Sequence, residues 1–280
     1  SGTSPSSIPL EIFRCNDCST IQLGINIDPH YLFSDYLWVT GTSRAAIEYA
    51  LRFAAWGNDL YSATEHSNLI VEIASNDGTF LREFQKLGWN VLGVDPAANI
   101  CETANERGIP TWCDFFDISI AEKILARGPA PDLVVARNVI PHVQNIHGVI
   151  EGMAKLISGG GVGIIEFHKS SLLLDQLHYD YIYHEHLFYF SLKTMSALLK
   201  MHGMTIFDLR ESPISGGSWV VYFSVDQLSR SDRLAAELDK EERLGIDELG
   251  RWKAFAHKVH AHKQEMISAL AKYDKPVLAY

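Results

Sequence analysis

Two histidines flank an acid in a strongly aromatic stretch of the sequence. Residues 180–190 hold His184, Glu185 and His186 together with five aromatic residues, one of which is Tyr183. A half-buried imidazole beside a carboxylate can act as a general base near neutral pH, and tyrosine hydroxyls can hydrogen-bond an oxyanion. Metal ligation is the alternative, but the two histidines lack the i, i+4 spacing of a helical zinc site. The cluster therefore favours acid–base chemistry.

Another pair of polar residues follows a predicted strand at 132–136. Asn138 and His142 come shortly after this strand, at the edge where open α/β sheets place their ligands. His168 follows a later strand at the same edge and is a weaker candidate. A single histidine at such a position is more often structural than catalytic. Because the aromatic cluster is also present, Asn138 and His142 are predicted to face a substrate.

The loop Ala74–Gly78 joins a buried strand to a helix. Free backbone N–H groups and the helix dipole can hold a negatively charged group there. Asp95 ends the next strand, where a carboxylate can accept hydrogen bonds from both ribose hydroxyls. The loop lacks G-x-G-x-x-G and the P-loop's Lys and Ser/Thr, which disfavours dinucleotides and triphosphates. A bound nucleoside is therefore predicted, with contacts from Ala74, Ser75, Asn76, Gly78 and Asp95.

An acid and two aromatic residues come after the expected third strand. Asp114 can accept a hydrogen bond from an adenine amino group, and Phe115 or Phe116 can cover the base. The alternative is a turn acid followed by two core aromatics. Because this segment follows the other two elements in order, the binding site is the preferred interpretation. It predicts a nucleoside of the adenosine type.

The pair Cys15-x-x-Cys18 supplies half of a tetrahedral zinc site, since structural zinc generally has four protein ligands. Two buried thiols in a small module are the alternative. A redox role is disfavoured because no thioredoxin-like βαβ unit surrounds the pair. The other two cysteines, Cys101 and Cys113, are isolated, so reduced thiols are expected rather than a disulfide framework.

Short apolar runs alternate with helical stretches from Asn68 onward. Such alternation predicts an α/β fold built on a parallel sheet. The last two strands, joined by a turn that contains Gly216-Gly217-Ser218, are expected to form an antiparallel edge. The predicted strands are 69–74, 90–94, 132–136, 161–167, 205–209 and 219–224. The predicted helices are 43–56, 78–87, 97–106, 118–126, 146–157 and 192–202.

Composition divides the chain into three parts. Residues 1–42 are expected to form a small N-terminal module, and residues 43–226 the main α/β domain. After Asp226 the sequence favours one or two amphipathic helices, which assigns 227–280 to a C-terminal helical segment. The final stretch, 275–280, is typical of a new strand, so the chain is expected to be cut short there.

Charge and hydropathy exclude several classes of protein. The 280 residues carry 24 basic and 34 acidic side chains, a net charge of −10, with no basic run, which argues against a nucleic-acid partner. No apolar run approaches the roughly 18 residues that span a bilayer. The start of the chain, 1–7, lacks the regions of a signal peptide. A cytoplasmic protein with no membrane partner is expected.

Over nearly its whole length the sequence resembles the sugar C-methyltransferases of deoxysugar pathways, which methylate nucleotide-linked keto sugars at C3. It departs from the family in lacking a first Cys-x-x-Cys pair before Cys15, and in having Trp219 and Val220 where an Arg usually follows Gly-Gly-Ser. The resemblance rests on Cys15-Asn16-Asp17-Cys18, Phe33-Ser34-Asp35-Tyr36, Val71-Glu72-Ile73-Ala74-Ser75-Asn76-Asp77-Gly78, Gly93-Val94-Asp95-Pro96-Ala97-Ala98-Asn99-Ile100, Asn138-Val139-Ile140-Pro141-His142-Val143, Tyr183-His184-Glu185-His186 and Gly216-Gly217-Ser218.

This resemblance implies a Rossmann-like class I methyltransferase fold with S-adenosylmethionine as cofactor. It also implies an N-terminal zinc module around Cys15 and Cys18, and a C-terminal domain that helps to enclose a nucleotide sugar. Tyr36, Pro96 and Asn138 lie in the shared segments and are thereby added to the predicted cofactor residues.

Catalytic roles follow from the same resemblance. It implies that His186 is the base, Tyr183 and Glu185 its partners, and His142 a group near the sugar. Carbon is not nucleophilic until a proton beside a carbonyl is removed, so C-methylation needs a base and a stabilised enolate. The hypothesis is that His186 takes the C3 proton of a dTDP- or GDP-linked 4-keto sugar. An O- or N-methyltransferase, or a nucleoside-binding domain without catalysis, is the alternative.

Overall fold

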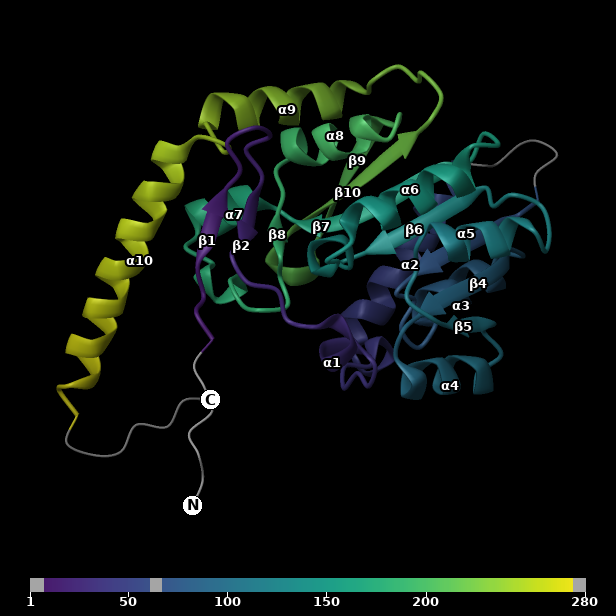
Figure 1. The fold of residues 1–280 in the computed structure, drawn as a ribbon, viewed down its shortest axis with the longest axis horizontal. Helices are drawn as coiled ribbons and strands as arrows, with labels where there is room; N and C mark the ends of the chain where they lie inside the picture. Colours follow the sequence, from purple (N-terminus) through teal and green to yellow (C-terminus); the bar gives the residue numbers. More distant parts are fainter. Residues whose placement is uncertain (1–7, 61–66, 274–280) are drawn as a thin grey trace.

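A seven-stranded mixed sheet forms the centre of the computed structural model, which describes residues 8–60 and 67–273 (Figure 1). The strand order is β5-β4-β3-β6-β7-β10-β9, in which the first five strands are parallel and β10 is antiparallel to both of its neighbours. The strands are β3 (Leu69–Ile73), β4 (Asn90–Asp95), β5 (Thr111–Cys113), β6 (Leu133–Arg137), β7 (Val162–His168), β9 (Thr205–Ser212) and β10 (Ser218–Ser224). The predicted α/β fold is thereby confirmed.

Helices cover both faces of this sheet, as its nearly continuous apolar strands require. One apolar core lies between the sheet and helices α2 and α3, and includes the buried rings of Tyr49, Phe53 and Phe84. A second core lies on the other face, under α5, α6 and α8. The helices around the sheet are α2 (Arg44–Asp59), α3 (Thr79–Lys86), α4 (Ala98–Glu106), α5 (Ile118–Leu125), α6 (Ile146–Ile157) and α8 (Leu192–Met201).

The last two strands form the expected antiparallel pair, but β10 lies inside the sheet and β9 at its edge. All seven residues of β10 are buried, whereas β9 mixes buried and partly exposed positions. A strand with two apolar faces needs neighbours and helices on both sides, so β10 is inserted between β7 and β9. The turn between the pair contains Gly216 and Gly217 at φ 76° and 135°, values that favour glycine.

A separate three-stranded sheet joins the beginning of the chain to its middle. Strands β1 (Ile12–Arg14) and β2 (Ile21–Leu23) form a hairpin, and β2 also pairs with β8 (Phe188–Tyr189). This sheet shares a small apolar core with α7 (Ser170–Asp175) and α10 (Leu249–Leu270). The N-terminal strands therefore pack directly behind the segment that carries the predicted catalytic histidine.

Two helices follow the central sheet, as the amphipathic pattern after Asp226 predicted. Helix α9 (Asp232–Leu244) is anchored by buried Glu241, whose carboxylate accepts hydrogen bonds from the N–H of Leu192 at 2.7 Å and from Nε1 of Trp219 at 3.2 Å. Helix α10 packs through its first half and then extends away from the body (Figure 1). The strand predicted at 275–280 lies outside the described residues. None of the helices within residues 8–60 and 67–273 is long and apolar enough to cross a membrane.

Candidate active site

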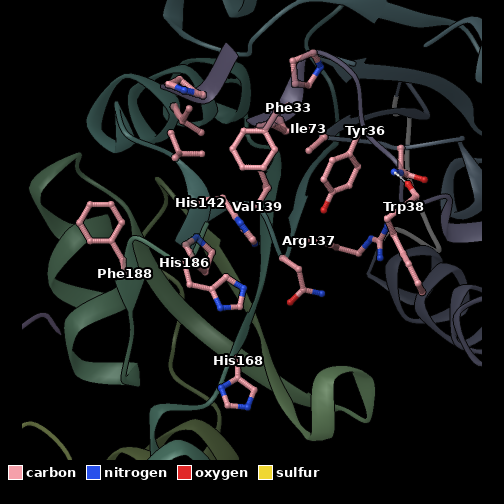
Figure 2. A pocket seen from close by; sticks show the side chains of 18 of the residues that line it. Phe33, Tyr36, Trp38, Ile73, Arg137, Val139, His142, His168, His186 and Phe188 are labelled. Atoms are coloured by element: carbon pink, nitrogen blue, oxygen red, sulfur yellow. Dashed lines mark hydrogen bonds between the residues drawn. The ribbon is translucent and has the colours of Figure 1, made fainter. Parts of the chain in front are cut away.

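A cavity of about 940 Å³ opens at the carboxyl ends of β3, β4, β6 and β7 (Figure 2). Open α/β sheets bind their ligands at this edge. The predicted site residues that line it are Tyr36, Ala74, Asn76, Asp95, Pro96, Phe115, Phe116, Asn138, His142, Tyr183 and His186. Within the described part of the chain, those outside the lining are Ser75, Gly78, Asp114, Glu185, Cys15 and Cys18.

The loop after β3 turns back over the end of β4. Ala74, Asn76 and Gly78 have φ of 52°, 50° and 73°, and the N–H of Ala74 donates to a carbonyl of β4 at 2.7 Å. The loop and β4 approach each other so closely at Gly93 that a Cβ atom there would lie 2.3 Å from Oγ of Ser75. This close approach brings the backbone of the loop to the cavity and leaves the side chain of Ser75 buried beneath it.

Asp95 ends β4 with its carboxylate fixed in place. The residue is only 6% exposed, Oδ2 accepts from the N–H of Asn76 at 2.9 Å, and Oδ1 accepts from the N–H of Ala97 at 3.0 Å. Burial raises the pKa of Asp95, and the two backbone donors oppose that effect. Each oxygen keeps a second lone pair, so the carboxylate can still accept hydrogen bonds from the hydroxyls of a ligand.

Asn76 and Asp77 attach residues 34–41 to the loop that follows β3. We call residues 34–41 the cover segment. Nδ2 of Asn76 donates to the carbonyl of Trp38 at 2.9 Å, and Oδ1 accepts from the N–H of Thr40 at 2.8 Å. Buried Asp77 accepts from the N–H of Gly41 at 3.2 Å and pairs with Arg107, which directly follows α4. The carboxamide of Asn76 thus supports the cavity wall. The sequence predicted a ligand contact for Asn76 but not this structural role.

The acid expected at the adenine position, Asp114, is exposed and accepts from the N–H of Phe115 at 2.9 Å. Asp117, three residues later, lines the cavity instead and caps α5 by accepting from the backbone N–H groups of two following residues. An acid immediately before a predicted helix is the signal that could have identified it. Phe115 faces the cavity, while Phe116 is 7% exposed and also belongs to the core.

His186 has its two ring nitrogens held by different partners. Nδ1 lies 2.7 Å from the carbonyl oxygen of Tyr181, and Nε2 lies 3.1 Å from the hydroxyl of Tyr183. A carbonyl only accepts, so Nδ1 carries the proton of the neutral ring and Nε2 is the basic nitrogen. Burial lowers the pKa of His186, which keeps the imidazole neutral near pH 7. The geometry therefore makes Nε2 the accepting nitrogen of the ring, which in this structure faces the hydroxyl of Tyr183.

His142 stands beside this base, with its ring centroid 4.7 Å from that of His186 (Figure 2). Burial and the neighbouring imidazole lower the pKa of His142 to about 3, so the two rings do not repel one another as cations. Glu185 lies outside the cavity lining, and burial raises its pKa. The phenol of Tyr36 also has a raised pKa, first through burial and then through the charges of Glu185 and Asp95.

Tyr181 and His168 join this cluster, although sequence reasoning gave Tyr181 no role and ranked His168 low. The ring of Tyr181 stacks on His168 with centroids 4.0 Å apart, and on His186 with centroids 5.4 Å apart. Its hydroxyl donates to the carbonyl of Ser215 at 3.1 Å. Burial lowers the pKa of His168 to about 4. The only signal for Tyr181 was its place in the aromatic stretch.

Arg137 lines the cavity at the end of β6 and was missed (Figure 2). Its Nε and Nη2 lie 2.8 and 2.7 Å from Oε1 of Glu72 on the adjacent β3, and the guanidinium lies 3.1 Å from the ring centroid of Phe80. A charged residue in each of two otherwise apolar strands was the available signal, since buried charges are normally paired.

The two N-terminal cysteines lie away from the cavity, in the hairpin of β1 and β2. Sγ of Cys18 donates to Oγ1 of Thr20 at 3.2 Å, and backbone hydrogen bonds lower the pKa of Cys15. Among the residues that the structure describes, no group of three or more His, Cys, Asp or Glu side chains could hold a metal ion. Two thiols do not fit the four-ligand tetrahedral site that zinc requires.

The parallel strands, the terminal carboxylate of β4 and the cavity at this edge are typical of Rossmann-like folds that bind nucleosides. Residues 44–209 match the family model described as a methyltransferase domain, and residues 213–280 match the C-methyltransferase C-terminal domain. The chain therefore belongs to the methyltransferase-domain family. The expectation of a methyltransferase is confirmed at the level of this family.

Individual relatives agree with this assignment. The C-methyltransferase NovU of Streptomyces niveus is 31% identical over 277 residues, which cover 97% of this chain and 66% of NovU. The chain thus spans less than two thirds of that relative. The solved structure of a putative O-methyltransferase from Nostoc punctiforme PCC 73102 shares the fold, with 15% identity, a TM-score of 0.50, and coverage of 64% of this chain and 56% of that one.

Proposed function

We propose that the chain is an S-adenosylmethionine-dependent C-methyltransferase that acts at C3 of a nucleotide-linked 4-keto deoxysugar with a dTDP or GDP carrier. The observation that carries the proposal is one cavity that holds both a nucleoside-type carboxylate, Asp95, and a neutral histidine base, His186. The C-methyltransferase relative and the matched C-terminal domain model support transfer to carbon. The sugar position and the nucleotide are the parts of the proposal that rest on sequence resemblance.

The residues around β4 and β5 suit S-adenosylmethionine. Asp95 presents free lone pairs to ribose hydroxyls, Phe115 offers an aromatic face to adenine, and the left-handed backbone at Ala74 lets a ligand approach the loop. When bound, the cofactor supplies an electrophilic methyl group. Pro96, Asn138 and Tyr36 complete the proposed cofactor contacts from the cavity lining.

The chain's own residues prepare the carbon. Nε2 of His186 takes the proton from C3 of the substrate, next to the 4-keto group, and the electron pair of the C–H bond becomes an enolate. The hydroxyl of Tyr183 or the neutral imidazole of His142 donates a hydrogen bond to the enolate oxygen. Glu185, which lies outside the cavity lining, is the remaining proposed partner of His186.

The decisive experiment is incubation of the protein with carbon-13 methyl-labelled S-adenosylmethionine and a panel of dTDP- and GDP-linked keto sugars. We expect a product whose labelled methyl carbon is bonded to carbon, with no methyl ester, ether or amine signal. The matched control is the corresponding 4-hydroxy sugar nucleotide, which has no acidified C3 proton and is expected to remain unmethylated. A labelled O- or N-methyl product would contradict the proposal.

A further inference from the structure

The backbone of Tyr36 is bound by a single side chain at two points. Oδ1 of Asn99 accepts from the N–H of Tyr36 at 3.2 Å, and Nδ2 of Asn99 donates to the carbonyl of Tyr36 at 2.9 Å. A carboxamide that bonds both groups of one residue imitates the pairing of a neighbouring strand. Asn99 lies in the first turn of α4, four residues after Asp95. The clamp therefore starts from the element that carries the proposed ribose ligand.

A second clamp lies at the other end of the cover segment. There Asn76 binds the carbonyl of Trp38 and the N–H of Thr40. At the end of the segment that Asn99 binds, the carbonyl of Ser34 accepts a further hydrogen bond from the N–H of Ala98 at 3.2 Å. Both asparagines belong to elements that form the proposed cofactor site, so the segment is fixed relative to that site from both sides.

Hydrogen bonds hold this segment because apolar packing does not. Leu37 is 94% exposed and Trp38 57% exposed, so their side chains bury little surface. Between the two clamps the phenol of Tyr36 enters the cavity (Figure 2). It lies near enough to Asp95 and Glu185 for both charges to act on it.

We propose that Asn99 is a positioning residue. Its carboxamide fixes the backbone of Tyr36 so that the phenol enters the cavity that Asp95 and His186 also line. The kinetic part of this inference rests on the proposed function. The structural part, in which Asn99 holds the cover segment, does not. Asn99 itself is exposed and does not line the cavity.

Hydrogen exchange tests the structural part without substrate or cofactor. In the Asn99→Ala variant we expect amides of residues 34–41 to exchange about tenfold faster, because two hydrogen bonds are lost from a segment with little packing. The matched control is Asn105→Ala. On the same helix, the carboxamide of Asn105 accepts from the N–H of Thr111 at 3.0 Å and donates to its carbonyl at 2.9 Å, away from the cavity. Unchanged exchange in Asn99→Ala, or an equal rise in Asn105→Ala, would overturn the proposal.

A second variant, Asn99→Asp, guards against loss of folding. An acid near the N-terminus of a helix is favourable, so α4 is retained. The carboxylate still accepts from the N–H of Tyr36 but cannot donate to its carbonyl, and we expect exchange between the wild-type and Asn99→Ala rates. Exchange of residues 34–41 at the wild-type rate in this variant would contradict a two-point clamp.

Steady-state kinetics test the functional part through a double-mutant cycle with Tyr36→Phe. We expect Asn99→Ala to lower kcat/KM about tenfold in the wild-type background and less than threefold when Tyr36→Phe is present, because both changes act on one phenol. Asn105→Ala should give wild-type kinetics below its unfolding temperature. Equal, additive effects in both backgrounds would overturn the positioning role. An inactive wild-type protein with the expected exchange pattern would instead refute the proposed function.

Discussion

The backbone carbonyl of Tyr181 lies 2.7 Å from Nδ1 of His186, and this contact determines which nitrogen of the ring is basic. The carbonyl holds the proton on Nδ1 and turns Nε2 towards the hydroxyl of Tyr183 at 3.1 Å. Tyr181 also stacks between His186 and His168, so one residue fixes both the tautomer and the orientation of the ring. The tautomer and orientation of His186 are therefore determined by Tyr181, whose own side chain has no proposed acid–base role.

Replacing His186 removes the proposed base while leaving the cofactor residues in place. For His186→Ala we expect methyl transfer to fall by about 10²–10⁴-fold, the usual contribution of a general base. Exchange of the C3 proton with deuterated solvent should fall in parallel, and affinity for S-adenosylmethionine should stay unchanged. His257→Ala, an exposed histidine on α10, is the control. Full exchange at C3 in His186→Ala would assign the base to another residue.

Tyr183→Phe tests the partner of the base. The tyrosine hydroxyl donates to the lone pair of neutral Nε2, which favours the neutral ring; its loss should raise the pKa of His186. The acidic limb of the kcat/KM profile against pH is therefore expected to move to higher pH, with a lower plateau. Tyr31→Phe, which removes a hydroxyl from an 84% exposed residue, should leave the profile unchanged. An acidic limb that stays in place would show that this hydrogen bond does not tune the base.

The elements of the fold could be predicted because local patterns determine them. Apolar runs predicted the ranges of six of the seven strands of the central sheet, all but the three-residue β5, and they placed Asp95 at the end of β4. The sequence of β10 also indicates a strand inside the sheet, because its seven residues include no charged side chain.

The contacts that complete the site could not be predicted in the same way. The carbonyl of Tyr181 and the backbone of Tyr36 act through atoms that every residue has, so their residue types carry no signal. The pairing of β2 with β8 and the bond between Arg137 and Glu72 join segments far apart in sequence. Such contacts depend on how the elements pack together, which periodicity does not encode.

We predict that Glu241 makes the stability of the protein depend on pH. Burial raises its pKa from 4.5 to about 7, although its oxygens accept from the N–H of Leu192 and from Trp219. A folded-state pKa above the unfolded value means that the stabilisation is full below about pH 4.5 and is lost as the pH rises through 7. The loss from this group alone is on the order of 3 kcal/mol.

Urea unfolding at pH 4.5 and pH 8 checks this dependence on Glu241→Gln, which imitates the protonated acid. We expect the free energy of unfolding of the variant, relative to wild type, to be higher at pH 8 than at pH 4.5 by on the order of 3 kcal/mol. Glu242→Gln alters the exposed neighbour on the same helix and should show no such trend. A relative stability of Glu241→Gln that does not change with pH would contradict the assignment.

The ion pair between Arg137 and Glu72 is predicted to stabilise the floor of the cavity only as a pair. The side chains are 10% and 2% exposed, and burial raises the pKa of Glu72 while the guanidinium lowers it. Arg137→Met leaves a buried carboxylate without its partner, so we expect a loss of about 3–5 kcal/mol in the free energy of unfolding. The double variant Arg137→Met/Glu72→Leu removes this pair and should recover the part of the loss that comes from Glu72. The charge of Arg137 also lowers the pKa of buried Glu166, and the double variant does not restore that effect. Lys155→Met, which breaks an exposed pair with Glu122, should cost at most about 1 kcal/mol. If the double variant were as unstable as Arg137→Met, the cost would not come from the unpaired carboxylate of Glu72, but from lost packing against Phe80 or from the charge of Glu166.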